Sequence, residues 1–236
     1  MIVKEVYDLC MKLEVVPKSI KKSIFNYDIN ALYESLRLQE EKDLLTNVEQ
    51  RKMALVLSTK YGDLVDKINE KSLDFSLIYK TMDYLDAEIE NALYGNYKLY
   101  AIQWGLSVKA LWFYRNNDFD QAIKITEECI AIIDEFIMNG MYCMVFRNIE
   151  LNKNLALVYN KKTGVQSGYK IICNIINYYF FSTNDHLYGL CFKNEEVREE
   201  MPYLRETMGY IFFREQVERY YSLLKSDLDM QIKNPV

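Results

Sequence analysis

The sequence predicts an all-α protein, and three observations indicate this. Apolar residues recur at helical spacing along almost the whole chain. Only 8 Gly and 3 Pro occur in 236 residues, which argues against a turn-rich β protein. Apolar residues make up 50% of the chain, enough for one cooperative core or one continuous stack of helices. Because no Ser-, Gly- or Pro-rich linker divides the chain, we expect a single all-helical domain over residues 1–236, or short N-terminal helices within residues 1–45 packed on a body of residues 46–236.

Short helices are predicted at the start of the chain. The apolar pattern predicts the first over residues 2–13. Pro17 suits the first position of a second helix that runs through residue 25, because its missing N–H is not needed there. Asp28 is a suitable cap for a third helix that ends near residue 38.

The next helix is predicted from a capping-box spacing. Thr46 and Glu49 are three residues apart, so each side chain can accept from the backbone amide of the other. This helix is expected to end at Lys60, before Tyr61 and Gly62. The same periodicity predicts further helices over residues 63–70, 74–92, 97–115, 119–138, 142–160, 165–181, 194–201 and 202–226, the last two divided at Pro202.

A tight helical hairpin is predicted around residue 117. Asn116, Asn117 and Asp118 break the first helix, since their side chains compete for backbone hydrogen bonds and tolerate turn geometry. Asp118 can cap the second helix, and Gln121 completes a capping-box-like pair with it. The two helices are therefore expected to be antiparallel neighbours.

Small and aromatic residues flank this turn in a recognisable order. Ala110 and Ala122 allow close approach of the two helices, Phe113 and Phe119 fill the volume beside them, and Cys129 follows as a further small residue. This order resembles one tetratricopeptide (TPR) repeat, a helix-turn-helix unit that stacks on its neighbours. A weaker copy begins 46 residues later, with residues 161–164 as its turn, on Ala156, Tyr159, Gly168, Ile172 and Ile175.

The spacing of the two copies exceeds the roughly 34 residues of a regular TPR. Either the helices are longer, or residues 137–149 form an irregular connection. The resemblance covers about residues 97–180 and implies helical hairpins stacked as a right-handed solenoid. An irregular helical bundle built from similar hairpins is the alternative fold.

The TPR resemblance also implies where a partner binds. The first helices of such repeats face a concave groove that receives a protein or peptide segment. The positions that would face it here are Trp104, Ser107, Leu111, Tyr114 and Arg115 in the first copy, and Glu150, Lys153, Leu157, Asn160 and Lys161 in the second. Tyr and Trp are good anchors, Asn can pair with a peptide backbone, and Arg or Lys can hold carboxylates.

Composition limits the other classes of partner. The net charge of −5 and the pI near 5.2 predict repulsion from nucleic acid and anionic lipid, so neither is an expected partner. The longest uncharged run, residues 171–184, is too short to span a bilayer, and no signal peptide is recognised. Five widely spaced Cys are expected to be buried thiols, which together with these features predicts a cytoplasmic protein.

The hypothesis that the protein is an enzyme rests on few residues. His186, in a loop beside Asp185, is the one histidine of the chain and a weak candidate for a general base. Asp83, Asp86 and Glu90 share one predicted helix face, but they lack matching ligands from other helices. Nucleophile-elbow, phosphate-loop, dinucleotide and zinc-helix motifs do not occur. No catalytic residue, metal site or cofactor is therefore predicted.

The sequence thus favours a non-enzymatic helical-repeat protein that binds a protein or peptide partner, as an adaptor, a peptide-sensing regulator or an inhibitor. The abundance of Ile, Lys, Asn and Tyr fits a low-GC bacterium or its phage. Apolar surface at an end of the stack would support a homodimer. The alternative is a helical-bundle enzyme or a carrier of a small ligand or metal, with an acidic, aromatic-lined pocket.

Overall fold

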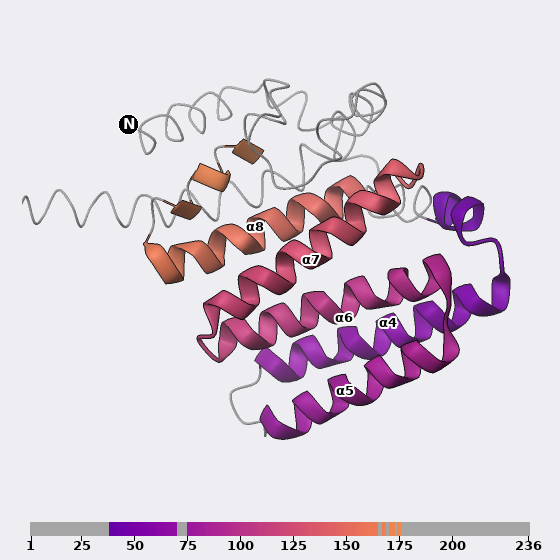
Figure 1. Ribbon diagram of the computed structural model, residues 1–236, viewed down its shortest axis with the longest axis horizontal. Coiled ribbons are helices and arrows are strands. Elements are labelled where there is room, and N and C mark those ends of the chain that lie inside the picture. Colours follow the sequence, from indigo (N-terminus) through magenta and orange to yellow (C-terminus); the bar gives the residue numbers. More distant parts are fainter. Residues whose placement is uncertain (1–37, 70–74, 165–166, 169, 173, 176–236) are drawn as a thin grey trace, which may run out of the picture.

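All regular structure that the computed structural model describes is helical, which confirms the all-α prediction (Figure 1). The described residues are 38–69, 75–164, 167–168, 170–172 and 174–175, and they contain no strand. Residues 38–44 form a helical segment, and the residues described after Gly164 are helical too. Between them lie five helices: α4 (Val48–Asn69), α5 (Phe75–Ala92), α6 (Gly95–Arg115), α7 (Phe119–Met138) and α8 (Met144–Thr163).

Successive helices run in alternating directions, and α4 lies between α5 and α6 (Figure 1). Helix α4 packs on α5 and on α6, α6 packs on α7, and α7 packs on α8. Helices α4, α6 and α8 are consequently parallel to one another. One continuous apolar core runs between all five helices, so no break between domains occurs within them.

Helix α4 corrects two sequence predictions. Gly62 was expected to end a helix, yet α4 continues through it to Asn69, because buried Tyr61 and Leu64 hold this turn against the core. Their burial outweighs the roughly 1 kcal/mol that a helical Gly costs relative to Ala. The cap is also displaced by one residue from Thr46. The Oδ1 atom of Asn47 accepts from the backbone amides of residues 49 and 50, at 3.0 and 3.1 Å.

The hairpin of α6 and α7 confirms the turn predicted at residues 116–118. Asn117 has a φ of 61°, a left-handed conformation that Asn tolerates, and Asp118 Oδ1 accepts from the Gln121 amide at 3.2 Å. The reciprocal half of the predicted capping box is wrong, since the Asp118 amide donates to the Phe113 carbonyl oxygen at 3.0 Å. Ala110 and Ala122 are both buried where the helices meet.

Long helices account for the wide spacing of the two repeat copies. Helices α6, α7 and α8 have 21, 20 and 20 residues, and only a short turn at residues 139–143 separates α7 from α8. The irregular connection that was the alternative does not occur. Helix α8 continues to Thr163, three residues beyond its predicted end, and stops at Gly164, whose φ is 94°.

One tyrosine, Tyr61, connects helices α4, α5 and α6. Tyr61 of α4 is fully buried, and its hydroxyl donates to the carboxylate of Asp86 on α5. The same carboxylate forms an ion pair with Lys109 of α6. Gly105 of α6 makes room for the ring, because an ideal Cβ there would lie 2.9 Å from Tyr61 Cζ. Burial and the neighbouring Asp86 carboxylate raise the pKa of Tyr61 far above its ordinary value, so the phenol remains a hydrogen-bond donor.

Several sequence predictions lie outside the described residues. They are the helices at 2–13 and 17–25, most of the helix at 28–38, the segments after residue 175, and the residues Cys10, Cys173, His186, Cys191 and Pro202. Within the described part, Cys129 and Cys143 are buried and form no disulfide. None of the helices described there is long and apolar enough to cross a membrane.

Candidate functional site

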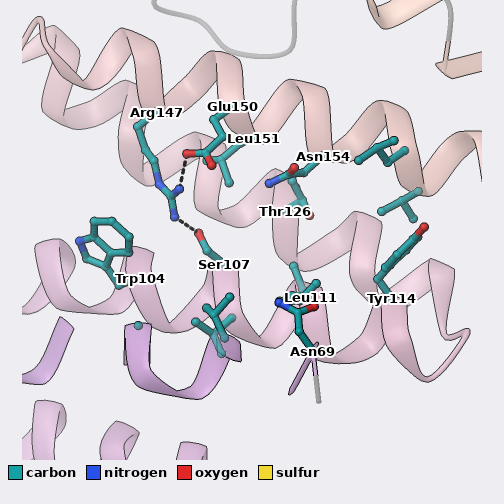
Figure 2. A pocket seen from close by; sticks show the side chains of 16 residues that line it. Asn69, Trp104, Ser107, Leu111, Tyr114, Thr126, Arg147, Glu150, Leu151 and Asn154 are labelled. Atoms are coloured by element: carbon teal, nitrogen blue, oxygen red, sulfur yellow. Dashed lines mark hydrogen bonds and ion pairs between the residues drawn. The ribbon is translucent and has the colours of Figure 1, made fainter. Parts of the chain in front are cut away.

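A groove of about 510 Å³ lies between the three parallel helices α4, α6 and α8 (Figure 2). Its floor is apolar and draws on all three helices. The floor residues are Val65 of α4, Val108 and Leu111 of α6, and Leu151, Leu157 and Val158 of α8. Gly62 leaves the α4 side open, since a Cβ at this position would meet no atom within 4 Å. Thr126 reaches the groove from α7, which lies behind it.

A charged group lies at the end of the groove marked by Trp104 (Figure 2). Arg147 extends from α8 toward α6, and its guanidinium carbon lies 4.5 Å from the centre of the Trp104 ring. Its Nη1 donates to Glu150 Oε2 at 2.6 Å, and its Nη2 donates to Ser107 Oγ at 2.7 Å. The Arg147 side chain keeps only 12% of its exposure, whereas that of Glu150 keeps 34%. The guanidinium is thus enclosed, and the carboxylate is the more accessible charge.

The partners of Ser107 explain why its hydroxyl accepts from Arg147. Ser107 Oγ donates to the Gln103 carbonyl oxygen at 2.9 Å, so its lone pairs are left for the guanidinium. The thiol of Cys129 lies 3.4 Å from the same hydroxyl and donates to Gln103 O at 3.1 Å. Burial raises the pKa of Cys129 above its ordinary value of 9.0, so this thiol is neutral and serves as a packing group.

A buried polar chain sets the rotation of α8 and thereby aims Arg147. Asn148 Nδ2 donates to Asp134 Oδ1 of α7 at 2.6 Å, and Asn152 Nδ2 donates to Asn148 Oδ1 at 2.7 Å. Both asparagines are fully buried. Because adjacent residues of a helix differ by about 100° in direction, Asn148 facing α7 turns Arg147 toward α6 and the groove.

Tyr114 lies at the opposite end of the groove, and Asn69 and Asn154 lie between the two ends, near Leu111 (Figure 2). The Tyr114 ring lies 6.0 Å from that of Phe119, which supports it from α7. Asn69 Oδ1 accepts from Arg115 Nη2 at 2.5 Å. Asn154 is half-buried, and its side-chain amide has no hydrogen bond among the described residues. This amide therefore offers both a donor and an acceptor to a bound molecule.

The structure brings together six of the ten groove positions implied by the sequence. Trp104, Ser107, Leu111, Tyr114, Glu150 and Leu157 line the groove. Arg115, Lys153, Asn160 and Lys161 do not belong to its lining. Asn160 is turned toward the helical residues that follow α8, because a Cβ on Gly168 would lie 2.1 Å from Asn160 Oδ1.

Sequence reasoning missed four polar residues of the groove: Asn69, Thr126, Arg147 and Asn154. Helical periodicity held a signal for the two on α8, Arg147 and Asn154. Arg147, Glu150, Asn154 and Leu157 recur at helical spacing and lie on one face of α8. The contribution of Val65 and the other α4 residues had no sequence signal, because it depends on how α4 packs against α6.

The acidic row on α5 does not form a cation site. Asp86 is bonded to Lys109 and Tyr61, whereas Glu90 pairs with Lys98 of α6 at 2.6 Å. Asp83 is exposed on the same helix. Within the described ranges no three acidic, His or Cys side chains converge closely enough to hold a metal ion.

Comparisons with models of known protein families, with curated proteins and with solved structures gave no match.

Proposed function

We propose that the chain is a non-enzymatic helical-repeat protein that binds a segment of a protein or peptide partner in the groove between α4, α6 and α8. The observation that supports this most directly is the composition of the groove: an apolar floor drawn from three parallel helices, with Trp104 at one end and Tyr114 at the other. Trp and Tyr side chains beside an apolar surface that loses its water on binding often contribute most of the binding energy.

The order of the helices suits a TPR-like stack, and we propose this arrangement for the binding protein. In such a stack the first helix of each hairpin faces the concave side, and α4, α6 and α8 hold that position here. Only Thr126 reaches the groove from a second helix, and α5 contributes nothing to the lining. Under this proposal, adaptor, peptide-sensing and inhibitory roles all use the same groove.

A small apolar ligand is the second candidate occupant, because about 510 Å³ falls within the range of small-molecule sites, roughly 300–1,000 Å³. The two occupants are separated by native mass spectrometry of the purified full-length protein. A small molecule that is retained at one per chain and lost when the groove is filled would favour this candidate over a peptide partner.

The main test fills the groove without disturbing the core. Gly62→Phe places a ring in open space on the α4 side, and its control Asp63→Phe adds the same ring to the neighbouring exposed position outside the lining. Both variants are used as baits beside the natural sequence, and captured proteins are quantified by mass spectrometry. We expect a stoichiometric partner to be retained by Asp63→Phe and lost by Gly62→Phe. Equal capture by the two variants would show that the partner binds elsewhere.

A further inference from the structure

The two charged residues of the groove differ in what they can still bind. Arg147 and Glu150 are the charged residues of its lining. Arg147 is enclosed by Trp104, Ser107 and Glu150, with its Nε buried and without a hydrogen-bond partner in the described part of the chain. An incoming anion would therefore have to displace Glu150 before it could reach the guanidinium.

Glu150 is accessible on its other side. Only its Oε2 accepts from Arg147, and its Oε1 accepts no hydrogen bond from the described residues. Asn154 lies one turn further along the same face of α8, and its amide oxygen likewise accepts no hydrogen bond from the described residues. Figure 2 shows both side chains on α8 above the apolar floor. Two acceptor oxygens one turn apart match an ammonium or a guanidinium, which carry several N–H donors and no acceptor.

We propose that the groove holds a Lys or Arg side chain of the bound segment, with the cationic head on Glu150 and Asn154. The aliphatic stem of that side chain lies on Leu111 and Leu151, because long basic side chains bury their methylenes along apolar surface. This inference rests on the proposed function and adds the chemistry of the ligand: a basic residue flanked by apolar ones. The net charge of −5 further favours a basic partner at the stage of encounter.

The experiment uses the full-length protein and a positional-scanning library of short peptides, acetylated and amidated so that terminal charges do not contribute. Binding is read by fluorescence polarisation. We expect one position to select Lys or Arg and its neighbours to select apolar residues. Replacing the selected basic residue by norleucine, which keeps the stem and removes the charge, should weaken binding about tenfold.

Variants of groove residues test whether the selection of Lys or Arg arises in the groove. Glu150→Gln should remove the preference for the basic residue over norleucine, and Asn154→Leu should reduce it while leaving the Arg147–Glu150 pair in place. Glu128→Gln is the matched control, because it makes the same charge change on the exposed face of α7, and it should leave the preference intact.

Each remaining outcome has a defined meaning. Selection of Asp or Glu, or a preference for apolar residues that ignores charge, would overturn the inference and leave the proposed function standing if Gly62→Phe still abolishes binding. Peptide binding that Gly62→Phe does not affect, or no binding by any peptide of the library, would overturn both.

Discussion

Two helical glycines that look alike in the sequence have opposite structural roles. Gly62 of α4 borders the open groove, whereas Gly105 of α6 lies against the ring of Tyr61. Each Gly costs helix stability relative to Ala through backbone entropy. At residue 105 that cost is offset by the close approach of α4 and α6, since any Cβ there would collide with a fully buried ring. At residue 62 nothing in contact offsets it.

Substituting each glycine by Ala should therefore change stability in opposite directions. Gly62→Ala should raise the free energy of unfolding by about 0.5–1 kcal/mol, because it favours the helix and meets open space. Gly105→Ala should lower it by about 1 kcal/mol or more, because the ring must shift within a packed core. Chemical denaturation monitored by circular dichroism measures both. A gain in stability for Gly105→Ala would contradict the close packing of Tyr61.

At the scale of elements, the helical segment of residues 38–44 is docked by polar contacts onto two other helices. Glu40 Oε2 accepts from the Cys143 backbone amide at 2.8 Å, at the start of α8. Glu41 Oε1 accepts from the Tyr100 hydroxyl of α6 at 2.6 Å. Just beyond the segment, the Asn47 backbone amide donates to the Tyr97 hydroxyl at 2.7 Å. Side chains that are distant in sequence thus hold the start of α4 in place.

This docking predicts a dependence of stability on pH. Burial raises the pKa of Glu40 above its ordinary value of 4.5, and the Cys143 amide opposes the shift only in part. The folded state therefore holds the proton more tightly than the unfolded state, so the contribution of Glu40 to stability is full below about pH 4.5 and falls as pH rises through the folded-state pKa.

Glu40→Gln keeps an acceptor oxygen for Cys143 and removes the titration. Relative to the natural sequence, this variant should gain stability as the pH is raised through the range above the ordinary pKa of 4.5, because Glu40 must then lose its proton in a desolvated site. Urea denaturation across that range tests this, with Glu128→Gln, exposed on α7, as the control. A stability difference that stays constant with pH would show that Glu40 is not desolvated in the folded protein.

At the scale of the whole molecule, the groove exists because three helices far apart in sequence are parallel neighbours. Residues from α4, α6 and α8 contribute to one floor, although α5 and α7 separate them along the chain. A ligand in this groove would contact α4, α6 and α8 at once and would stabilise the folded chain by mass action. Helix α5 packs on the outer side of α4 and contributes no lining residue.

Hydrogen exchange should reveal this arrangement directly. Saturation with a groove-binding peptide should increase amide protection together in α4, α6 and α8 and leave that of the exposed face of α5 nearly unchanged. Mass spectrometry of proteolytic fragments reports each helix separately. Protection confined to α5, or to the exposed face of α7, would place the binding surface outside the groove.

Local chemistry accounts for the elements that the sequence predicted well. The Asn-Asn-Asp turn fixed the boundary between α6 and α7, and the range 119–138 coincides with α7 because Asp118 caps its first turn. The helix end predicted at Tyr61 and Gly62 was wrong for an equally physical reason. A Gly ends a helix unless tertiary burial holds the turn, and the burial of Tyr61 between α4, α5 and α6 is invisible to a local pattern.

The sequence by itself determined helices α5 to α8 to within a few residues, the turn between α6 and α7, and the α6 face of the groove, because periodicity and capping act within a few residues. Only the tertiary structure decided that α4 supplies one wall, that Arg147 is enclosed by Trp104 and Ser107, and that Glu150 remains accessible. Those features depend on the packing of helices that are distant in sequence, as the contact between Glu40 and Cys143, 103 residues apart, illustrates. Such contacts are set by the shape of the whole core, which no local spacing encodes.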